Sequence, residues 1–129
     1  MATAFLTLDE VLAVHAHQIA TYGGTPGLRD AGLLESAVAM PRTTFDGEHV
    51  HGDVYEMAAA YLFHLVKNHP FVDGNKRAGL ACALAFLRLN RVRIRATDDE
   101  FVKLVVSVAG GDVSKAAIAV FLRAHASRR

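Results

Sequence analysis

Apolar residues recur every three or four positions through most of the chain, a spacing that places them on one face of an α-helix. Such stripes predict helices over residues 8–21, 31–40, 53–68 and 75–90, a fifth between Thr97 and Gly110, and a sixth over residues 112–125. Thr7 and Glu10 have the capping-box spacing that begins a helix. Thr97 and Glu100 repeat that spacing before the fifth helix. The pattern therefore predicts an all-α fold with about six helices.

The predicted helix over residues 75–90 is apolar around most of its circumference, as is typical of a helix buried on all sides. We expect it to be the central helix of a compact bundle. Residues 41–52 show no helical pattern, and Asp46 with Gly47 forms a favoured two-residue hairpin turn. A short flap is therefore predicted around residues 44–50, with an ordinary connecting loop as the alternative.

The amino-acid composition limits which kinds of protein the chain can be. The chain has 129 residues, of which 52% are apolar, and this fits one domain over residues 1–129 with a substantial core. The net charge of +1 gives no electrostatic argument for direct binding to DNA. The one cysteine, Cys82, excludes an internal disulfide, fits a reducing cytoplasm and is expected in the core.

Neither a membrane span nor a signal peptide is visible in the sequence. The longest apolar run, residues 78–87, falls well short of the roughly 20 residues of a membrane-spanning helix. The first residues lack the basic and apolar regions of a signal peptide. We therefore expect a cytoplasmic protein without a membrane partner.

A polar stretch, residues 68–77, joins the third and fourth predicted helices. It brings together a histidine, a carboxylate, an amide, an amine and a guanidinium: His69, Asp73, Asn75, Lys76 and Arg77. Pro70 disfavours helical geometry at His69, so the third helix should end there. Gly74 allows the backbone to turn tightly and to approach a ligand closely. Phe71, the one large apolar residue of the loop, is expected to point into the core.

These residue types suit phosphate chemistry. The helix that begins at Asn75 offers unpaired backbone N–H groups and the positive end of a helix dipole, which together bind anions readily. Lys76 and Arg77 lie on the same first turn and can donate further hydrogen bonds to phosphate oxygens. Asp73 can hold a Mg²⁺ that bridges phosphates, and His69 could accept a proton from an incoming hydroxyl. A simple network at a helix end is the alternative.

The run from His69 to Arg77 resembles the signature of the Fic/Doc family, whose Fic form is His-x-Phe-x-Asp/Glu-Gly-Asn-Gly-Arg-x-x-Arg. Lys76 replaces the second glycine, and Leu80 stands where the second arginine would be. Both departures match the Doc (death-on-curing) branch, whose signature runs Asn-Lys-Arg. The resemblance covers nearly the whole chain and implies the Fic/Doc fold, with a short flap beside the active site.

The resemblance to Doc implies a toxin of a toxin–antitoxin pair. Such a toxin transfers a phosphoryl group from a nucleoside triphosphate, expected to be ATP, to a Ser/Thr hydroxyl of a translation factor, elongation factor Tu, and so blocks translation. The cofactor implied is Mg²⁺. The residues implied are His69, Asp73 and Arg77 for catalysis, Asp73 for the metal, and Gly74, Asn75, Lys76 and Arg77 for the nucleotide.

A partner is also implied, because the chain lacks the inhibitory motif Ser/Thr-x-x-x-Glu-Gly/Asn that many Fic proteins carry. The nearest run, residues 44–48, is followed by His49 and spans the predicted turn. The expected partner is an antitoxin whose disordered tail folds into a helix on binding. We expect it to fill an apolar groove along the first helices.

Other functions stay open at this point. A Fic-type transferase that moves AMP onto a protein hydroxyl is favoured by Gly74 and opposed by Lys76 and Leu80, since a lysine side chain fills the space around the inner phosphates. A catalytically silent binding module is opposed by the intact motif. Four arginines could form a basic strip for RNA or an acidic partner, although a solvated surface is the simpler interpretation: Arg88, Arg91, Arg93 and Arg95.

Overall fold

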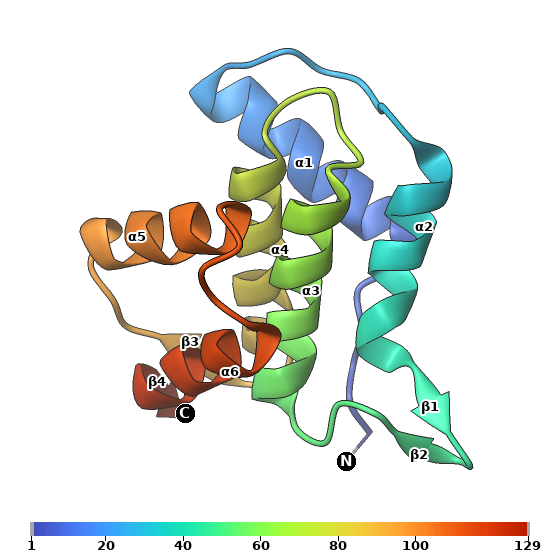
Figure 1. The fold of residues 1–129 in the computed structure, drawn as a ribbon, viewed down its shortest axis with the longest axis vertical. Coiled ribbons are helices and arrows are strands. Elements are labelled where there is room, and N and C mark those ends of the chain that lie inside the picture. The colour runs from blue at the N-terminus through green and yellow to red at the C-terminus, as the bar shows by residue number, and fades with distance from the viewer. Residues whose placement is uncertain (1, 129) are drawn as a thin grey trace.

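Two antiparallel helices form the centre of the computed structural model, which describes residues 2–128 (Figure 1). The helices in this range are α1 (Leu8–Tyr22), α2 (Ala31–Ala39), α3 (Val54–Asn68), α4 (Asn75–Leu89), α5 (Asp98–Ala109) and α6 (Lys115–Ala124), with a 3₁₀ turn, η1, at Met40–Arg42. α3 and α4 are the central pair, and the other helices pack around them. The predicted all-α bundle is confirmed.

Side-chain caps explain where these helices begin. The Thr7 hydroxyl accepts a hydrogen bond from the Glu10 N–H, and Glu10 bonds the Thr7 N–H in return. Thr97 and Glu100 form the same capping box at α5. The sixth helix starts later than predicted, because the Ser114 hydroxyl caps it and Lys115 is its first residue. Helix starts were thus encoded locally, to within a few residues.

The central helix is α3, so the expectation that residues 75–90 form the most buried helix was wrong. α3 packs against α2, α4, α5 and α6, whereas α4 leaves Leu89 half exposed. The two helices come close at Gly79, where an added Cβ would lie 3.2 Å from the Leu62 carbonyl oxygen. An apolar circumference therefore does not by itself make a helix central, since the number of packed neighbours decides burial.

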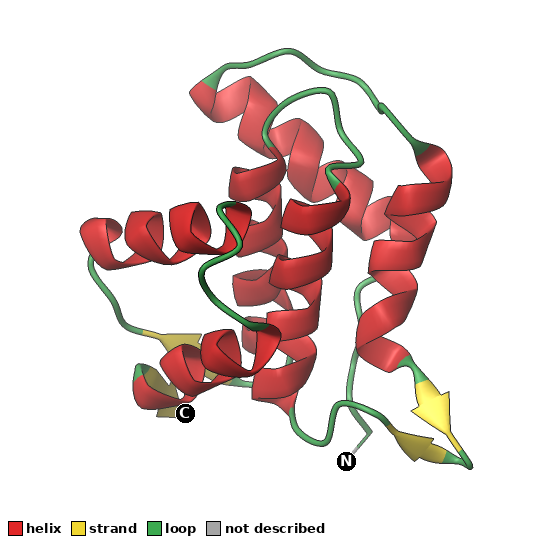
Figure 2. Cartoon of the chain, in the orientation of Figure 1, coloured by secondary structure: helices red, strands yellow, loops and turns green. Residues whose placement is uncertain are grey.

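Within residues 2–128, the strands form two short antiparallel pairs (Figure 2). The first is the predicted flap, in which β1 (Thr44–Phe45) pairs antiparallel with β2 (Glu48–His49) through the turn at Asp46 and Gly47. The second was not predicted: β3 (Val92–Ile94) pairs antiparallel with β4 (Ala126–Arg128) and ties the end of α4 to the end of the chain.

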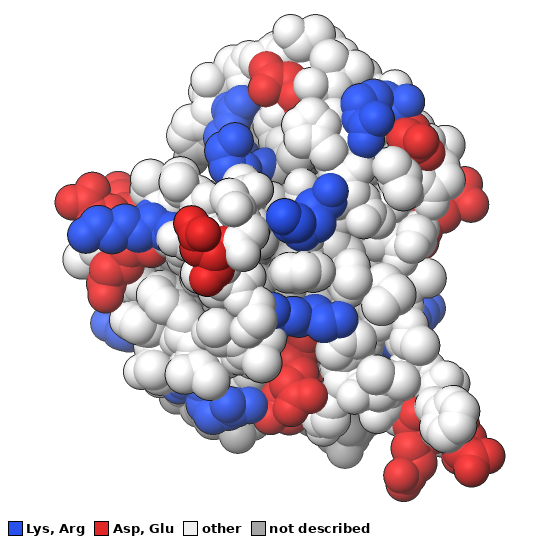
Figure 3. All heavy atoms as spheres, in the orientation of Figure 1, with Lys and Arg blue, Asp and Glu red and all other residues white. Residues whose placement is uncertain are grey.

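The core and the surface agree with the composition. Cys82 is buried, and burial raises the pKa of its thiol to about 12. Acidic and basic side chains are scattered over the face shown in Figure 3 and do not gather into one patch. Within residues 2–128, no helix has the length and apolar content required to span a bilayer.

Candidate active site

The loop between α3 and α4 turns sharply at His69, which ends α3 in the left-handed conformation (φ 52°, ψ 54°). That conformation costs a residue other than glycine about 1 kcal/mol. The Arg29 guanidinium offsets this by capping the end of α3. It donates to the carbonyl oxygens of His69 at 2.6 Å and Asn68 at 2.9 Å. The loop is therefore held by a side chain about 40 residues earlier in the sequence.

Phe71 and Asn75 fix the middle of the loop. Phe71 is 1% exposed, as predicted, and its ring stacks on that of His15. The Asn75 side chain accepts a hydrogen bond from the Phe71 N–H and donates one to the Phe71 carbonyl, both at 3.0 Å. Asn75 is 5% exposed. The Asn75 amide group therefore fixes the backbone of the loop from its buried side.

The segment after α1 lies along the other side of the loop. The Val72 N–H donates to the Gly27 carbonyl at 3.0 Å, and Leu28 and Phe71 form an antiparallel bridge. The Thr25 N–H reaches the Asp73 carboxylate at 3.0 Å. Gly24 lies so close that an added Cβ would be 2.8 Å from the same carboxylate. Residues 24–28 thus support the loop from the side of α1.

The surroundings of Asp73 favour the ionised form of its carboxyl group. Backbone hydrogen bonds from Thr25 and Gly74 lower the pKa of its carboxyl group, and the nearby charges of Arg77 and His15 lower it further. The Gly74 N–H donates to the second carboxylate oxygen at 2.8 Å. The side chain is exposed, so the ionised oxygens remain accessible to a cation.

α4 starts without a side-chain cap. Its N-cap is Gly74, in the left-handed conformation at φ 77°. The first backbone N–H groups of α4 therefore remain open to an anion, and the helix dipole adds partial positive charge there. Lys76 is exposed on this turn. Arg77 is half-buried and donates from Nη1 to the Gln18 carbonyl at 3.4 Å, which holds part of its guanidinium against α1.

One cleft of ≈ 320 Å³ brings these groups together, and we call it the motif cleft. Every site residue predicted from the sequence lines this cleft, together with one residue of α3 and one of α5. The lining residues are Val66, His69, Asp73, Gly74, Asn75, Lys76, Arg77 and Ala109. His69 and Lys76 are its exposed side chains of basic type. The geometry therefore offers a proton acceptor, a carboxylate and an anion-binding helix end within one hollow.

Sequence reasoning missed the residues that support the cleft from outside the loop. The Arg29 side chain bonds a backbone carbonyl of the loop, and the Thr25 backbone N–H bonds the Asp73 carboxylate. No local pattern marks such contacts. His15 did leave a signal, because it shares the apolar face of α1 with Val11 and Ile19. A histidine at such a position must find a polar partner inside the fold.

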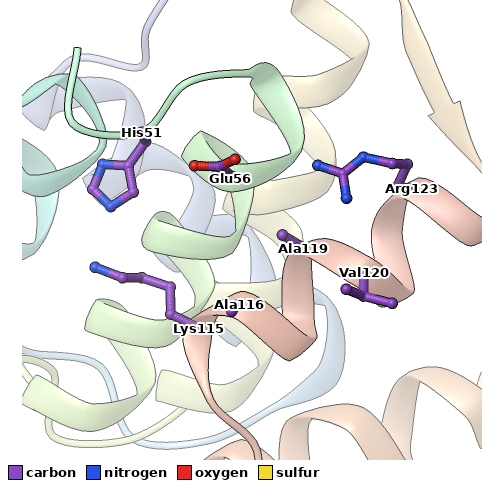
Figure 4. A pocket seen from close by; sticks show the side chains of 7 residues that line it. All are labelled: His51, Glu56, Lys115, Ala116, Ala119, Val120 and Arg123. Carbon is purple, nitrogen blue, oxygen red and sulfur yellow. The ribbon is translucent and has the colours of Figure 1, made fainter.

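A second cavity of ≈ 390 Å³, the α3–α6 cavity, contains none of the predicted site residues. Its lining is His51, Glu56, Lys115, Ala116, Ala119, Val120 and Arg123 (Figure 4). The Lys115 ammonium lies 3.0 Å from Nε2 of His64. Burial, followed by the charge of Lys115, lowers the pKa of His64 to about 4. Basic side chains occur here as well, but none of the loop residues 68–77 is in its lining.

Comparison with known proteins agrees with the geometry. The sequence profile of the Fic/DOC family matches residues 5–87. The chain is 36% identical over 115 residues to a protein named protein kinase doc from Escherichia phage P1, covering 89% of this chain and 90% of the phage protein. It is 42% identical over 97 residues to a protein named toxin Doc from Mycolicibacterium smegmatis, covering 75% of this chain and 72% of that protein.

Proposed function

The chain belongs to the Fic/DOC family, and we propose on this basis that it is a Doc-like toxin of a toxin–antitoxin pair. The proposed reaction transfers a phosphoryl group from a nucleoside triphosphate, ATP, to a Ser/Thr hydroxyl of elongation factor Tu. The names of the two relatives, a protein kinase and a toxin, support this proposal. The observation that carries it is the motif cleft, where His69, Asp73 and Lys76 surround the uncapped end of α4.

His69 is the proposed base. The hydroxyl oxygen of the target attacks the γ-phosphorus, and its proton passes to the His69 ring. The bond between the γ-phosphorus and the oxygen that bridges it to the β-phosphorus breaks, and a nucleoside diphosphate leaves. The rigid turn at His69, capped by Arg29, supports this role because general-base catalysis depends on a fixed geometry.

Asp73 would hold the Mg²⁺. Its donor set fits a hard cation, because two ionised oxygens are exposed in the cleft and each accepts one backbone hydrogen bond, which leaves further lone pairs free. When bound, Mg²⁺ neutralises charge on the phosphate oxygens. Thr25 and Gly74 contribute by keeping the carboxylate ionised and aimed into the cleft.

The phosphates would lie against the first turn of α4. Gly74 leaves room for the close approach of a ligand, and the N–H groups that follow it are open. Lys76 supplies a flexible ammonium, and Arg77 supplies the part of its guanidinium that Gln18 does not hold. Asn75 contributes through its backbone N–H, since its side chain is engaged by Phe71. Catalysis of this kind is mainly positioning and charge stabilisation.

An antitoxin is the proposed regulator. A groove of ≈ 310 Å³ lies between the start of α1 and α2, and most of its surface is apolar. The residues that line it are Leu6, Thr7, Leu8, Glu35, Val38, Ala39 and Arg42. An amphipathic helix of a partner could fill such a groove. Co-expression with the product of the adjacent gene should relieve toxicity and yield a stable complex. A chain that is harmless at high expression and binds no such neighbour would count against the toxin–antitoxin proposal.

The decisive experiment uses ATP labelled at either the γ- or the α-phosphate, with purified elongation factor Tu as acceptor. Phosphoryl transfer predicts that only the γ-label enters the acceptor, at a Ser/Thr residue identified by mass spectrometry. Incorporation of the α-label would instead identify a nucleotidyl transferase, which is the second candidate. No incorporation from either label, into this acceptor or into a cell extract, would favour a silent binding module.

A further inference from the structure

His15 is a buried histidine of α1 that the proposed chemistry does not use. It is 5% exposed and is not part of the cleft lining. Its ring stacks on Phe71 with 3.7 Å between centroids and 3° between planes. Its Nε2 lies 2.8 Å from the backbone carbonyl oxygen of Asp73. Because a carbonyl oxygen can only accept, Nε2 must carry a hydrogen and donate it.

This hydrogen bond fixes a peptide plane inside the motif. The peptide group is planar and trans, so the direction of the Asp73 carbonyl also sets the direction of the Gly74 N–H. The carbonyl points to α1, and the Gly74 N–H donates to Oδ1 of Asp73 at 2.8 Å. One plane thus controls both a carbonyl oxygen near the cleft and the orientation of the carboxylate.

The plane needs an external support, because Gly74 supplies no restraint. Glycine accepts positive and negative φ almost equally, so a plane that precedes it can rotate at little cost. A larger residue is disfavoured, since Gly74 has φ 77° and an added Cβ would lie 3.1 Å from Cδ1 of Ile19. The position therefore requires both a glycine and a restraint supplied by α1.

Rotation of the plane would damage the phosphate site in two ways. The Asp73 carbonyl oxygen would turn from α1 toward the start of α4, where its partial negative charge opposes a bound anion. The Gly74 N–H would leave the Asp73 carboxylate at the same time. We propose that His15 is a positioning residue that locks the Asp73–Gly74 peptide plane and so keeps the carbonyl oxygen out of the cleft. The proposal rests on the proposed function, because it assigns the lock a role in phosphate binding.

Two substitutions separate the hydrogen bond from the stack. His15→Gln keeps an N–H donor near the position of Nε2 and loses the aromatic ring, whereas His15→Phe keeps the ring and loses the donor. His17→Phe, two residues along on the exposed side of α1, is the matched control. Loss of one buried hydrogen bond predicts an increase of about 3- to 10-fold in the KM for MgATP in His15→Phe. We expect His15→Gln and the control to stay within about 2-fold of the parent.

Nuclear magnetic resonance tests the lock without any transfer reaction. In the parent protein the His15 Nε2–H should give a slowly exchanging ring signal, and the Gly74 amide should be protected. In His15→Phe the Gly74 amide should lose protection and shift or broaden. His15→Gln should keep most of that protection, and amides of α6 should not change in either variant. Thermal unfolding of each variant shows whether the fold is intact.

Two outcomes would overturn the proposal that His15 fixes the Asp73–Gly74 peptide plane. One is an unchanged Gly74 amide and KM in His15→Phe. The other is equal losses in both His15 variants, which would indicate that His15 serves general packing. The proposed function fails separately, through absence of phosphoryl transfer by the parent protein. In that case a Gly74 response confined to His15→Phe would still establish the lock.

Discussion

The motif cleft and the α3–α6 cavity contain similar residue types and use them in opposite ways. Both have a histidine, a carboxylate, a lysine and an arginine. In the α3–α6 cavity the charged groups bond to the protein itself: Arg123 pairs with Asp53 at 2.8 Å, Lys115 meets His64 at 3.0 Å, and Glu56 accepts from the Gly52 N–H at 3.1 Å. These side chains hold α6 and the segment before α3 against the core.

In the motif cleft, by contrast, the side chains of Arg29 and Asn75 hold the loop. His69, Asp73 and Lys76 are left exposed. Neither Lys76 nor Arg77 forms an ion pair within residues 2–128. The N-terminus of α6 is capped by Ser114, whereas that of α4 has no side-chain cap. Residue types alone therefore do not identify a site for chemistry. The α3–α6 cavity also has a buried group without a hydrogen-bond partner in the described part of the chain, Nδ1 of His51. What distinguishes the motif cleft is an uncapped helix start beside an exposed carboxylate and an exposed ammonium.

Replacing the histidine of each cavity tests this contrast most strongly. His69→Ala should lower phosphoryl transfer by about 10²- to 10⁴-fold, because the proposed base is removed. The fold should survive, since His69 is exposed. His51→Ala, the matched change in the α3–α6 cavity, should leave the rate of transfer unchanged. Initial rates with γ-labelled ATP, at equal amounts of folded protein, measure both effects. Full activity of His69→Ala would reject the mechanism.

Lys76→Gly restores the Asn-Gly-Arg run of the Fic signature and should have the next largest effect. Removal of a charged phosphate contact predicts a loss of about 10- to 100-fold in γ-transfer. Some α-label should enter the acceptor if Lys76 selects which phosphate faces the hydroxyl, but Leu80 still lacks the second arginine. Lys115→Gly is the control at the start of α6. Unchanged γ-transfer in Lys76→Gly would show that Lys76 does not select the phosphate.

The neighbouring glycines Gly23 and Gly24 offer a matched pair that tests how the segment after α1 supports the motif loop. Both have positive φ, 86° and 122°, so alanine strains either position by about 1 kcal/mol. Only at Gly24 does the added Cβ meet the Asp73 carboxylate, at 2.8 Å, and the Arg77 guanidinium, at 3.0 Å. Gly24→Ala should therefore lower transfer by about 10-fold, whereas Gly23→Ala should change only the unfolding temperature. Equal rates in the two variants would show that the segment after α1 does not position Asp73.

Much of the fold could be predicted because its signals are local. The capping box at Thr7, the hairpin turn at Asp46 and the stop before Pro70 each depend on residues within a few positions of one another. The burial of Phe71 followed from its being the large apolar residue of a polar loop. The motif itself is also contiguous, which explains why its six predicted residues lie in one cleft.

The remainder depends on contacts between distant segments. The pairing of β3 with β4 joins residues more than 30 positions apart, and the alternation of arginine with Val92 and Ile94 was its one trace in the sequence. The central place of α3 depends on how many helices pack on it, which no single-helix pattern reports. Arg29 and His15 reach the motif loop across 40 and 58 positions, so only the folded chain reveals their roles.

Acid stability provides the last and smallest test. The pKa of His64 is lowered from 6.5 to about 4 by burial and by Lys115, so the unfolded chain takes up this proton first as the pH falls. The contribution of His64 to the free energy of unfolding is therefore present above pH 6.5 and is lost between pH 6.5 and about 4. After allowance for solvent screening, the loss should be about 1 kcal/mol at pH 5.

His64→Gln isolates this contribution, because glutamine can still accept from Lys115 but does not titrate. Urea unfolding of the parent protein and the variant at pH 7 and pH 5 measures the difference, in which the other histidines cancel. The parent should lose about 1 kcal/mol more than the variant on acidification. Phosphoryl transfer at pH 7 should be equal in the two, since His64 contacts Lys115 of the α3–α6 cavity, whose charged groups serve the fold. An identical pH dependence would contradict the uncharged state of the half-buried His64. A loss of transfer would contradict the separation of the two regions.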